Sequence, residues 1–514
     1  MNKHPQPSPP LASKAASEND AESAPLQTAG NAGALAVFDP ASTRAAITAR
    51  FRKEDGAVQQ RAMIVEVLGK ALEKGRAALA ESLSEAPVVS RPITRGYAAL
   101  HDGIVDTVYW AATTLFHPNS VHTQGERLAV LAVGGYGRFE MAPHSDIDLL
   151  FLTPHKITPW VESIVETMLY VLWDLKLKVG QASRTLRDCI RLAREDFTIR
   201  TSMVEQRVIC GDSALAQELK EKLWSELFKN TAPEFIEAKL NERAQRHRKQ
   251  GGQRYVVEPN VKEGKGGLRD LQSLFWIAKY MHGVNDAKEL VALGMFSEDE
   301  FETFVTAEDF LWAVRCHLHL IADRAVDQLS FDMQVAVAER MGYADGKGRR
   351  AVEHFMQDYF LQATRVGELT RIFLTGLEET HVKSEPVLQR FFKRQPKVRA
   401  PFAILQNRIT VQSEDAFLDD KLNILRLFEE ALRTGSLIHP DAMRIVSANL
   451  HLIDDDMRER KEAVRIFHDL LLKHGNPERS LRRMNELGVL AAFLPEFEPI
   501  VAMMQFNMYH HYTV

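Results

Sequence analysis

The chain has 514 residues, more than a single hydrophobic core usually organises, so two or three domains are expected. Hydrophobic residues make up 45% of the sequence and charged residues 26%, which is ordinary for a globular protein. The net charge of −5 argues against a general nucleic-acid binder, and no apolar run approaches the roughly 20 residues of a membrane span. The three cysteines show no zinc or disulfide spacing and favour a reduced, cytoplasmic compartment.

The N-terminal third of the chain is predicted to be a tail followed by helices. Residues 1–40 are rich in Pro, Ala and Ser and lack the apolar segment of a signal peptide, so they are predicted to be disordered. Over 41–126, apolar residues recur at the three- and four-residue spacing of amphipathic helices. This pattern predicts an N-terminal helical region with helices at 41–83 and 91–116.

Residues 127–230 alternate short apolar strands with helices, which predicts a small mixed sheet covered by helices. The following segment, 231–380, is helical in pattern throughout. The fold class is therefore α+β, and largely α overall. The strands are expected at 127–133, 146–153, 178–183 and 201–210, and the helices of this unit at 159–175 and 186–194.

A glycine-rich turn follows the first predicted strand, and two aspartates stand at the start of the second. Side chains two residues apart on a strand point the same way, so the carboxylates of Asp146 and Asp148 share a face, about 6–7 Å apart. That spacing suits Mg²⁺, which prefers hard oxygen ligands and keeps substrate phosphates in its shell. Gly134, Gly135 and Gly137 give a backbone that a phosphate can approach closely. Together these features indicate nucleotidyl transfer.

Glu205 lies within the predicted fourth strand, in a partly apolar run. Strand alternation would place it on the same face as Met203 and Arg207. A buried carboxylate costs free energy unless it is paired or holds a metal. Two interpretations therefore stay open, namely a salt bridge to Arg207 or to another arginine, and a third metal ligand.

The helical segment contains two groups of basic residues. The run at 243–249, with Arg243, Arg246 and His247 among its members, is interpreted as a solvated helix face. The loop 264–267 is flanked by cations and precedes a helix that is expected to start near residue 268. Glycines and cations before a helix N-terminus make a candidate anion site, although the P-loop motif is absent. Beside the acidic pair, this loop becomes a candidate clamp on a triphosphate or on a partner protein.

A polar, proline-punctuated stretch at 378–401 marks the last predicted boundary, and helices are expected beyond it at 416–434, 441–452 and 455–474. The chain ends in the apolar, aromatic run MQFNMYHHYTV. Termini are usually polar and frayed, so we expect these 514 residues to have been cut from a longer protein.

Four segments carry a family resemblance. The first, VGGYGRFEMAPHSDIDLLFL (133–152), resembles the polymerase β-like nucleotidyltransferase superfamily, whose motif is a glycine turn followed by an acidic pair. The others extend the similarity to the bacterial bifunctional uridylyltransferase/uridylyl-removing enzymes, which modify the PII nitrogen-signalling protein. They are EPNVKEGKGGLRDLQSLFWIAK (258–279), LWAVRCHLHLIADRAVDQLSFDMQVAVAERMGY (311–343) and LPEFEPIVAMMQFNMYHHYTV (494–514).

The resemblance implies an activity and a set of site residues. Members of this family transfer UMP from UTP to a tyrosine hydroxyl of PII and release pyrophosphate, with Mg²⁺ or Mn²⁺ as cofactor. Asp146, Asp148 and Glu205 match the catalytic, metal-binding carboxylates. The residues expected at the nucleotide are Gly134, Gly135, Arg138, Ser145, Lys262, Lys265 and Arg269.

The family continues with an HD phosphohydrolase domain that removes UMP and with two ACT domains that sense glutamine. Residues 381–514 are expected to begin the HD domain without completing it. His510 and His511 are adjacent, which is a poor geometry for sharing one metal. Removal of UMP and the response to glutamine are therefore expected to be missing from these 514 residues.

Two alternatives to the uridylyltransferase stay open. One is an adenylyltransferase of the glutamine synthetase type, because the acidic pair does not reveal which base is chosen. The other is a non-catalytic regulator with the nucleotidyltransferase fold. Neither nucleic acid nor a membrane is expected as a partner.

Overall fold

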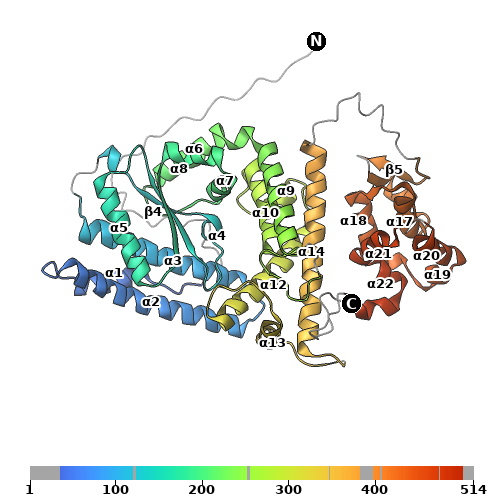
Figure 1. The fold of residues 1–514 in the computed structure, drawn as a ribbon, viewed down its shortest axis with the longest axis horizontal. Coiled ribbons are helices and arrows are strands. Elements are labelled where there is room, and N and C mark those ends of the chain that lie inside the picture. The colour runs from blue at the N-terminus through green and yellow to red at the C-terminus, as the bar shows by residue number, and fades with distance from the viewer. Residues whose placement is uncertain are drawn as a thin grey trace, which may run out of the picture. The chain divides into compact units, whose positions relative to one another are not determined.

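The computed structural model describes residues 35–119, 123–251, 255–346, 348–381, 397–405, 408–473 and 475–501 (Figure 1). Most of the predicted N-terminal tail lies outside the described residues, as do His510 and His511. In the part of the chain that is described, no helix is long and apolar enough to cross a membrane. The three cysteines are buried and form no disulfide.

Among the described residues, three α-helices precede the sheet: α1 (Pro40–Arg50), α2 (Ala57–Glu85) and α3 (Arg91–Ala111). The Asp39 carboxylate caps α1 by accepting the backbone N–H groups of Ala41 and Ser42. α3 continues into a π-helical turn, η1 (Ala112–Phe116). The predicted helices are thus confirmed, with a break at 51–56 inside the first of them.

The sheet has four strands in the order β3-β2-β1-β4. β1 runs antiparallel to β2 and β4, and β2 runs parallel to β3, so the sheet is mixed as predicted. The helices α3, α5 and α8 all contact it. The bounds are β1 (Ala129–Ala132), α4 (Gly134–Gly137), β2 (Ile147–Thr153), α5 (Pro159–Asp174), β3 (Val179–Thr185), α6 (Leu186–Glu195), α7 (Phe197–Val204), β4 (Arg207–Gly211) and α8 (Ser213–Glu226).

The prediction of a strand at 201–210 is wrong in its first half, where α7 is found. Asp196 starts this helix because its carboxylate accepts the N–H groups of Thr198 and Ile199, at 2.6 and 3.0 Å. Glu205 is therefore the residue that ends a helix, and β4 begins two residues later. Strand alternation does not apply to Glu205.

The helical region that follows packs into one hydrophobic core with the sheet and the N-terminal helices. Its helix α10 begins at Leu268, where the sequence predicts a helix start. The bounds are α9 (Ala232–Lys249), α10 (Leu268–His282), α11 (Glu289–Ala292), α12 (Glu298–Ala322), α13 (Phe331–Arg340) and α14 (Ala351–His381).

The last described segment has a core of its own, built around residues such as Phe417, Phe428 and Ile466. It contains a three-stranded sheet that the sequence does not reveal, because strands of two to four residues are too short to show a period. Its elements are β5 (Phe402–Leu405), β6 (Arg408–Val411), α16 (Glu414–Leu418), α17 (Asn423–Thr434), β7 (Leu437–Ile438), α18 (Pro440–Ala448), α19 (Asp455–Glu459), α20 (Lys461–Leu472), α21 (Pro477–Glu486) and α22 (Val489–Phe493). Mostly helical structure with small mixed sheets confirms the α+β class. The predicted domain limits and the incomplete HD domain stay predictions.

The close approach of Gly137 to the end of α7 predicts a stability effect. A Cβ atom at Gly137 would overlap the carbonyl oxygen of Glu205, so we expect Gly137→Ala to lower the free energy of unfolding by about 1–3 kcal/mol. At Gly69, inside α2, a Cβ would lie 3.8 Å from a methyl group of Leu175, which is an ordinary contact. Gly69→Ala should therefore raise stability, by up to about 1 kcal/mol. Urea unfolding checks both, and an unchanged midpoint for Gly137→Ala would contradict the packing described.

Candidate active site

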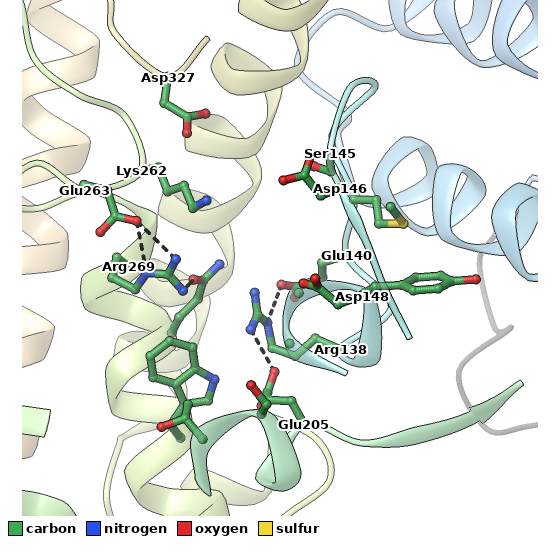
Figure 2. Close-up of a pocket in the computed structure, with 18 of the residues that line it drawn as sticks. Arg138, Glu140, Ser145, Asp146, Asp148, Glu205, Lys262, Glu263, Arg269 and Asp327 are labelled. Atoms are coloured by element: carbon green, nitrogen blue, oxygen red, sulfur yellow. Dashed lines mark hydrogen bonds and ion pairs between the residues drawn. The ribbon is translucent and has the colours of Figure 1, made fainter. Parts of the chain in front are cut away.

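A cavity of about 430 Å³ lies beside the sheet, and its wall is shared by the glycine turn, the start of β2, α7, α9, α10 and α12 (Figure 2). Seven acidic residues and five lysines or arginines line it, within the part of the chain that the structure describes. The acidic residues are Glu140, Asp146, Asp148, Glu205, Glu242, Glu263 and Asp327, and the basic residues are Arg138, Lys239, Lys262, Arg269 and Arg315.

The acidic pair is held in place by the register of β2. Val133 donates its backbone N–H to the carbonyl of Asp148 at 3.1 Å, and Ile147 donates to the carbonyl of Lys178 at 2.8 Å. Asp146, directly before β2, is exposed and Asp148 is half-buried, and both line the cavity. A Cβ at Gly180 on the neighbouring strand would overlap the Asp148 carboxylate, so glycine makes room for it there.

The glycine turn lies directly against this pair. Residues 134–137 form the single helical turn α4, and Gly134 adopts a left-handed φ of 60° that glycine tolerates without strain. A Cβ at Gly134 would stand 3.4 Å from a carboxylate oxygen of Asp148. Ser145 also lines the cavity, and its hydroxyl accepts the backbone N–H of Ala142 at 3.0 Å.

Most charges in the cavity are balanced by a partner. Arg138 pairs with Glu140 at 3.0 Å and with Glu205 at 2.8 Å. The other pairs are Lys239 with Glu242 at 2.5 Å, Arg269 with Glu263 at 3.1 Å and Arg315 with Asp327 at 2.7 Å. Among the described residues, Asp146, Asp148 and Lys262 form no such ion pair or hydrogen bond through their charged groups. The cavity therefore leaves two negative charges and one positive charge without partners.

The two kinds of unpartnered charge are disfavoured by their surroundings. Burial, together with the charge of Asp146, raises the pKa of the Asp148 carboxyl. Burial, together with Arg315 and Arg269, lowers the pKa of the Lys262 ammonium. A cation bound at the acidic pair and an anion bound at Lys262 would favour the charged forms of both groups. Perturbed groups of this kind are typical of functional sites.

Glu205 is buried, with 1% of its surface exposed, and the salt-bridge interpretation holds for it. Its partner is Arg138, whereas Arg207 pairs with Asp102 at 2.7 Å. The second oxygen of Glu205, Oε1, is buried without a hydrogen-bond partner. Its role as a third metal ligand stays a prediction, and in the described residues no group of three acidic, histidine or cysteine side chains is arranged to hold a metal ion.

The acidic pair fits Mg²⁺ by the chemistry of its donors. Two carboxylates without internal partners offer hard oxygen ligands and leave the remaining coordination positions to water and substrate phosphates, which is how Mg²⁺ usually binds. The like charges of Asp146 and Asp148, which raise the pKa of Asp148, are what such a cation would neutralise.

The two basic segments of the sequence have different surroundings in the structure. Lys262 and Arg269 line the cavity, whereas Lys265 does not. The interpretation of 243–249 as a solvated face is wrong for part of the run. Arg246 is 9% exposed, and it turns inward with Arg243 and His247 onto Asp270, because three- and four-residue spacing puts them on one side of α9.

Several cavity residues were missed by sequence reasoning. Glu140 and Glu263 stand inside motifs that the sequence singles out, so their nearness to Arg138 and Arg269 offered a signal. Lys239 on α9, Arg315 on α12 and Asp327, between α12 and α13, come from parts of the chain far from the acidic pair and carry no local signal.

A small mixed sheet with a glycine turn and an unpartnered acidic pair, facing a cation-lined helical wall, is the architecture of a nucleotidyltransferase region followed by helical domains. Comparison with known proteins narrows this class. Residues 234–374 match the family described as GlnD PII-uridylyltransferase, and residues 402–493 match the uridylyltransferase GlnD third domain.

Curated relatives match nearly the whole chain. Bifunctional uridylyltransferase/uridylyl-removing enzymes of Ruegeria pomeroyi and Cereibacter sphaeroides are each 62% identical, over 93% and 88% of this chain and over 52% and 49% of their own lengths. That of Novosphingobium aromaticivorans is 44% identical over 93% of this chain and 52% of its own length. Over most of its own length the chain is similar to these GlnD uridylyltransferases, and it spans about half the length of the curated relatives it matches.

The raised pKa of Asp148 predicts a pH-dependent change in stability. Asp148→Asn removes a carboxylate whose charged form is disfavoured in the folded protein, so it should raise the melting temperature at neutral pH. The gain should shrink as the pH falls through the raised pKa, because the wild-type carboxyl then becomes neutral too.

Asp212→Asn is the matched control for this prediction. A hydrogen bond from Arg127 lowers the pKa of Asp212, so its charged form stabilises the fold. The control should lower the melting temperature at neutral pH, with a deficit that shrinks in acid. Thermal unfolding followed by circular dichroism across this pH range gives both signs, and a loss of stability in Asp148→Asn at neutral pH would contradict the electrostatics described.

Proposed function

We propose that the chain transfers UMP from UTP to a tyrosine hydroxyl of the PII nitrogen-regulatory protein and releases pyrophosphate. One observation carries the proposal, namely that Asp146, Asp148 and Lys262 are left without ion-pair partners in a cavity whose other lysine, arginine and acidic side chains are paired, within the described residues. A nucleoside triphosphate with divalent cations supplies both missing charges. Similarity to the uridylyltransferase family supports UTP and PII as the particular substrates.

Asp146 and Asp148 are the proposed ligands of Mg²⁺, or of Mn²⁺, and Glu205 is the proposed third ligand through its unpartnered Oε1. When bound, such a cation neutralises phosphate charge and polarises the reacting oxygens. A tyrosine hydroxyl has an ordinary pKa of about 10, so it must also lose its proton to react at neutral pH. A carboxylate of this cavity is the proposed acceptor of that proton.

The remaining side chains would hold the nucleotide. Gly134 and Gly135 allow the triphosphate to approach the backbone, beside Ser145. Arg138 is fixed by Glu140 and Glu205 at the edge of the acidic pair (Figure 2). Four cations are proposed to take up the charge of the leaving pyrophosphate, namely Arg138, Lys262, Lys265 and Arg269. Of these four, Lys265 does not line the cavity.

The decisive test combines PII, labelled UTP and Mg²⁺ with a double variant. Asp146→Asn with Asp148→Asn should reduce labelling of PII by at least about 1000-fold, because it removes the proposed metal ligands while keeping side-chain size. Asp106→Asn is the matched control. It breaks an aspartate–arginine pair with Arg44 that lies outside the cavity, and it should leave transfer near the wild-type rate.

The same assay separates the alternatives. Labelling from ATP in place of UTP would favour the adenylyltransferase, and a double variant that keeps full activity would rule out the acidic pair as the catalytic centre. Absence of transfer from either nucleotide by the wild-type chain would leave the non-catalytic regulator.

Glu205→Gln distinguishes a metal ligand from a partner of Arg138. Glutamine keeps an oxygen for Arg138 but is a weaker ligand, so loss of a third ligand should raise the Mg²⁺ concentration that gives half-maximal transfer by about tenfold. Glu140→Gln changes the other partner of Arg138 and should leave the Mg²⁺ dependence unchanged. If Glu205→Gln changes only the KM for UTP, Glu205 acts through Arg138 alone.

A further inference from the structure

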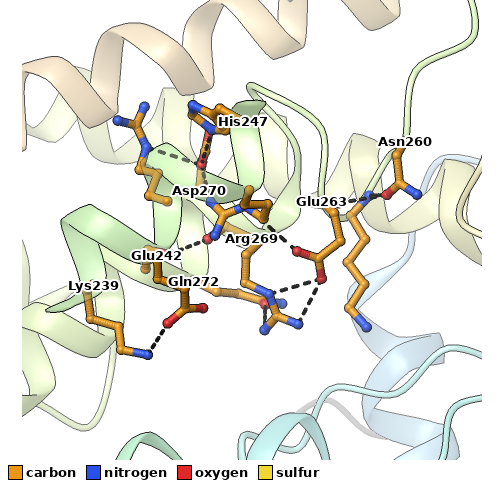
Figure 3. Close-up of polar contacts among 12 residues, drawn as sticks. Lys239, Glu242, His247, Asn260, Glu263, Arg269, Asp270 and Gln272 are labelled. Atoms are coloured by element: carbon orange, nitrogen blue, oxygen red, sulfur yellow. Dashed lines mark hydrogen bonds and ion pairs between the residues drawn. The ribbon is translucent and has the colours of Figure 1, made fainter. Parts of the chain in front are cut away.

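Asp270 is a fully buried carboxylate in the first turn of α10, outside the cavity lining. Its Oδ1 accepts hydrogen bonds from three side chains of α9, as Figure 3 shows for His247. The distances are 3.2 Å from Arg243, 2.5 Å from Arg246 and 2.9 Å from His247. Burial opposes its charge, but His247 and the two arginines outweigh burial and hold the pKa of Asp270 well below its usual range.

The other oxygen of Asp270 connects this cluster to the glycine-rich loop 264–267 (the glycine loop). Oδ2 accepts the backbone N–H of Gly266 at 2.9 Å. The negative charge that favours the N-terminus of α10 is therefore supplied by the Asp270 carboxylate of the chain itself. Gly266 has a left-handed φ of 84°, and a Cβ there would overlap the carbonyl of Ala363 on α14. The loop is thus held between Asp270 on one side and α14 on the other.

The rest of the segment 260–269 is equally constrained. The side-chain oxygen of Asn260 accepts the N–H groups of Lys262 and Glu263, at 3.1 and 2.7 Å. Arg269 donates its backbone N–H to the carbonyl of Lys262 at 2.9 Å. Fixing the backbone on both sides of Lys262 sets the direction in which its long, flexible side chain leaves the loop.

A chain of ion pairs leads from the same cluster to Arg269. Arg246 lies 3.7 Å from Glu263, and Glu263 pairs with Arg269 at 3.1 Å (Figure 3). Arg269 also lies over the ring of Trp276, with 5.2 Å to the ring centroid, on the cavity wall. Asp270 is therefore connected to Lys262 through the backbone of the loop and to Arg269 through side chains.

We propose that Asp270 is a positioning residue for nucleotide binding, which fixes segment 260–269 so that Lys262 and Arg269 present their charges to the phosphates opposite the acidic pair. The inference rests on the proposed function, because it takes UTP as the ligand of the cavity. A lysine on an unfixed loop loses more side-chain and backbone freedom on binding, so its contribution to affinity falls.

The test measures KM for UTP, kcat and equilibrium binding of UTP in the full 514-residue chain with Mg²⁺ and PII. Asp270→Asn keeps the shape of the side chain but removes the charge onto which Arg243, Arg246 and His247 converge. We expect at least a tenfold rise in the KM and the Kd for UTP, with a smaller change in kcat. Asp106→Asn, which breaks the pair with Arg44 away from the cavity, should change neither.

A mutant cycle separates positioning from a general loss of stability. Because Asp270 is proposed to act through both Lys262 and Arg269, adding Asp270→Asn to a variant that carries Lys262→Ala and Arg269→Ala should weaken UTP binding much less than it does in the wild-type background. Losses that multiply fully in that combined variant would overturn the inference. So would a folded Asp270→Asn protein with the wild-type KM for UTP.

His247→Ala keeps the test decisive if Asp270→Asn does not fold. This variant removes one hydrogen-bond partner of Asp270 and leaves both arginines in place. The His247 side chain is 12% exposed. We expect a smaller rise in the KM for UTP in the same direction, and an unchanged KM would overturn the inference. A wild-type chain that neither binds UTP nor labels PII would instead refute the proposed function.

Discussion

The candidate active site depends on a pair of like charges, Asp146 and Asp148, that form no ion pair within the described residues. Asp148 lies on β2 and Asp146 directly precedes that strand, and the charge of Asp146 helps raise the pKa of Asp148. Carboxylates in such a setting are normally paired with a cation of the protein. Every other acidic residue of the cavity, within the described residues, has such a partner. Only the two carboxylates that a bound cation would reach lack a partner among the acidic residues of the cavity, within the described residues.

Two buried networks hold the opposite walls of the cavity. On the sheet side, Arg138 lies between Glu140 and Glu205 and joins the glycine turn to the end of α7. On the helical side, Asp270 joins α9, α10 and the glycine loop. Buried ion pairs often add little net stability, but breaking one leaves an uncompensated charge. We infer that both networks serve mainly to fix the groups that face the nucleotide.

The parts of the site that could be predicted from sequence are those written in a few consecutive residues. The glycine turn, the acidic pair and the start of α10 each depend on local geometry, and each lies where its spacing predicts. The apolar neighbours of Glu205 predict a strand, yet the capping carboxylate of Asp196 starts a helix just before it. The sequence predicts a solvated face for Arg246 because its partner, Asp270, lies on the next helix and no local pattern connects the two residues.

The central claim is that the acidic pair seats divalent cations beneath a triphosphate held by the opposite wall. The most direct measurement is a crystal structure of the chain with Mn²⁺ and a non-hydrolysable UTP analogue, using the anomalous signal of manganese to locate the ion. The account predicts an anomalous peak between the carboxylates of Asp146 and Asp148, with phosphate oxygens within reach of Lys262. Manganese and phosphates bound elsewhere, with the acidic pair left uncoordinated, would contradict it.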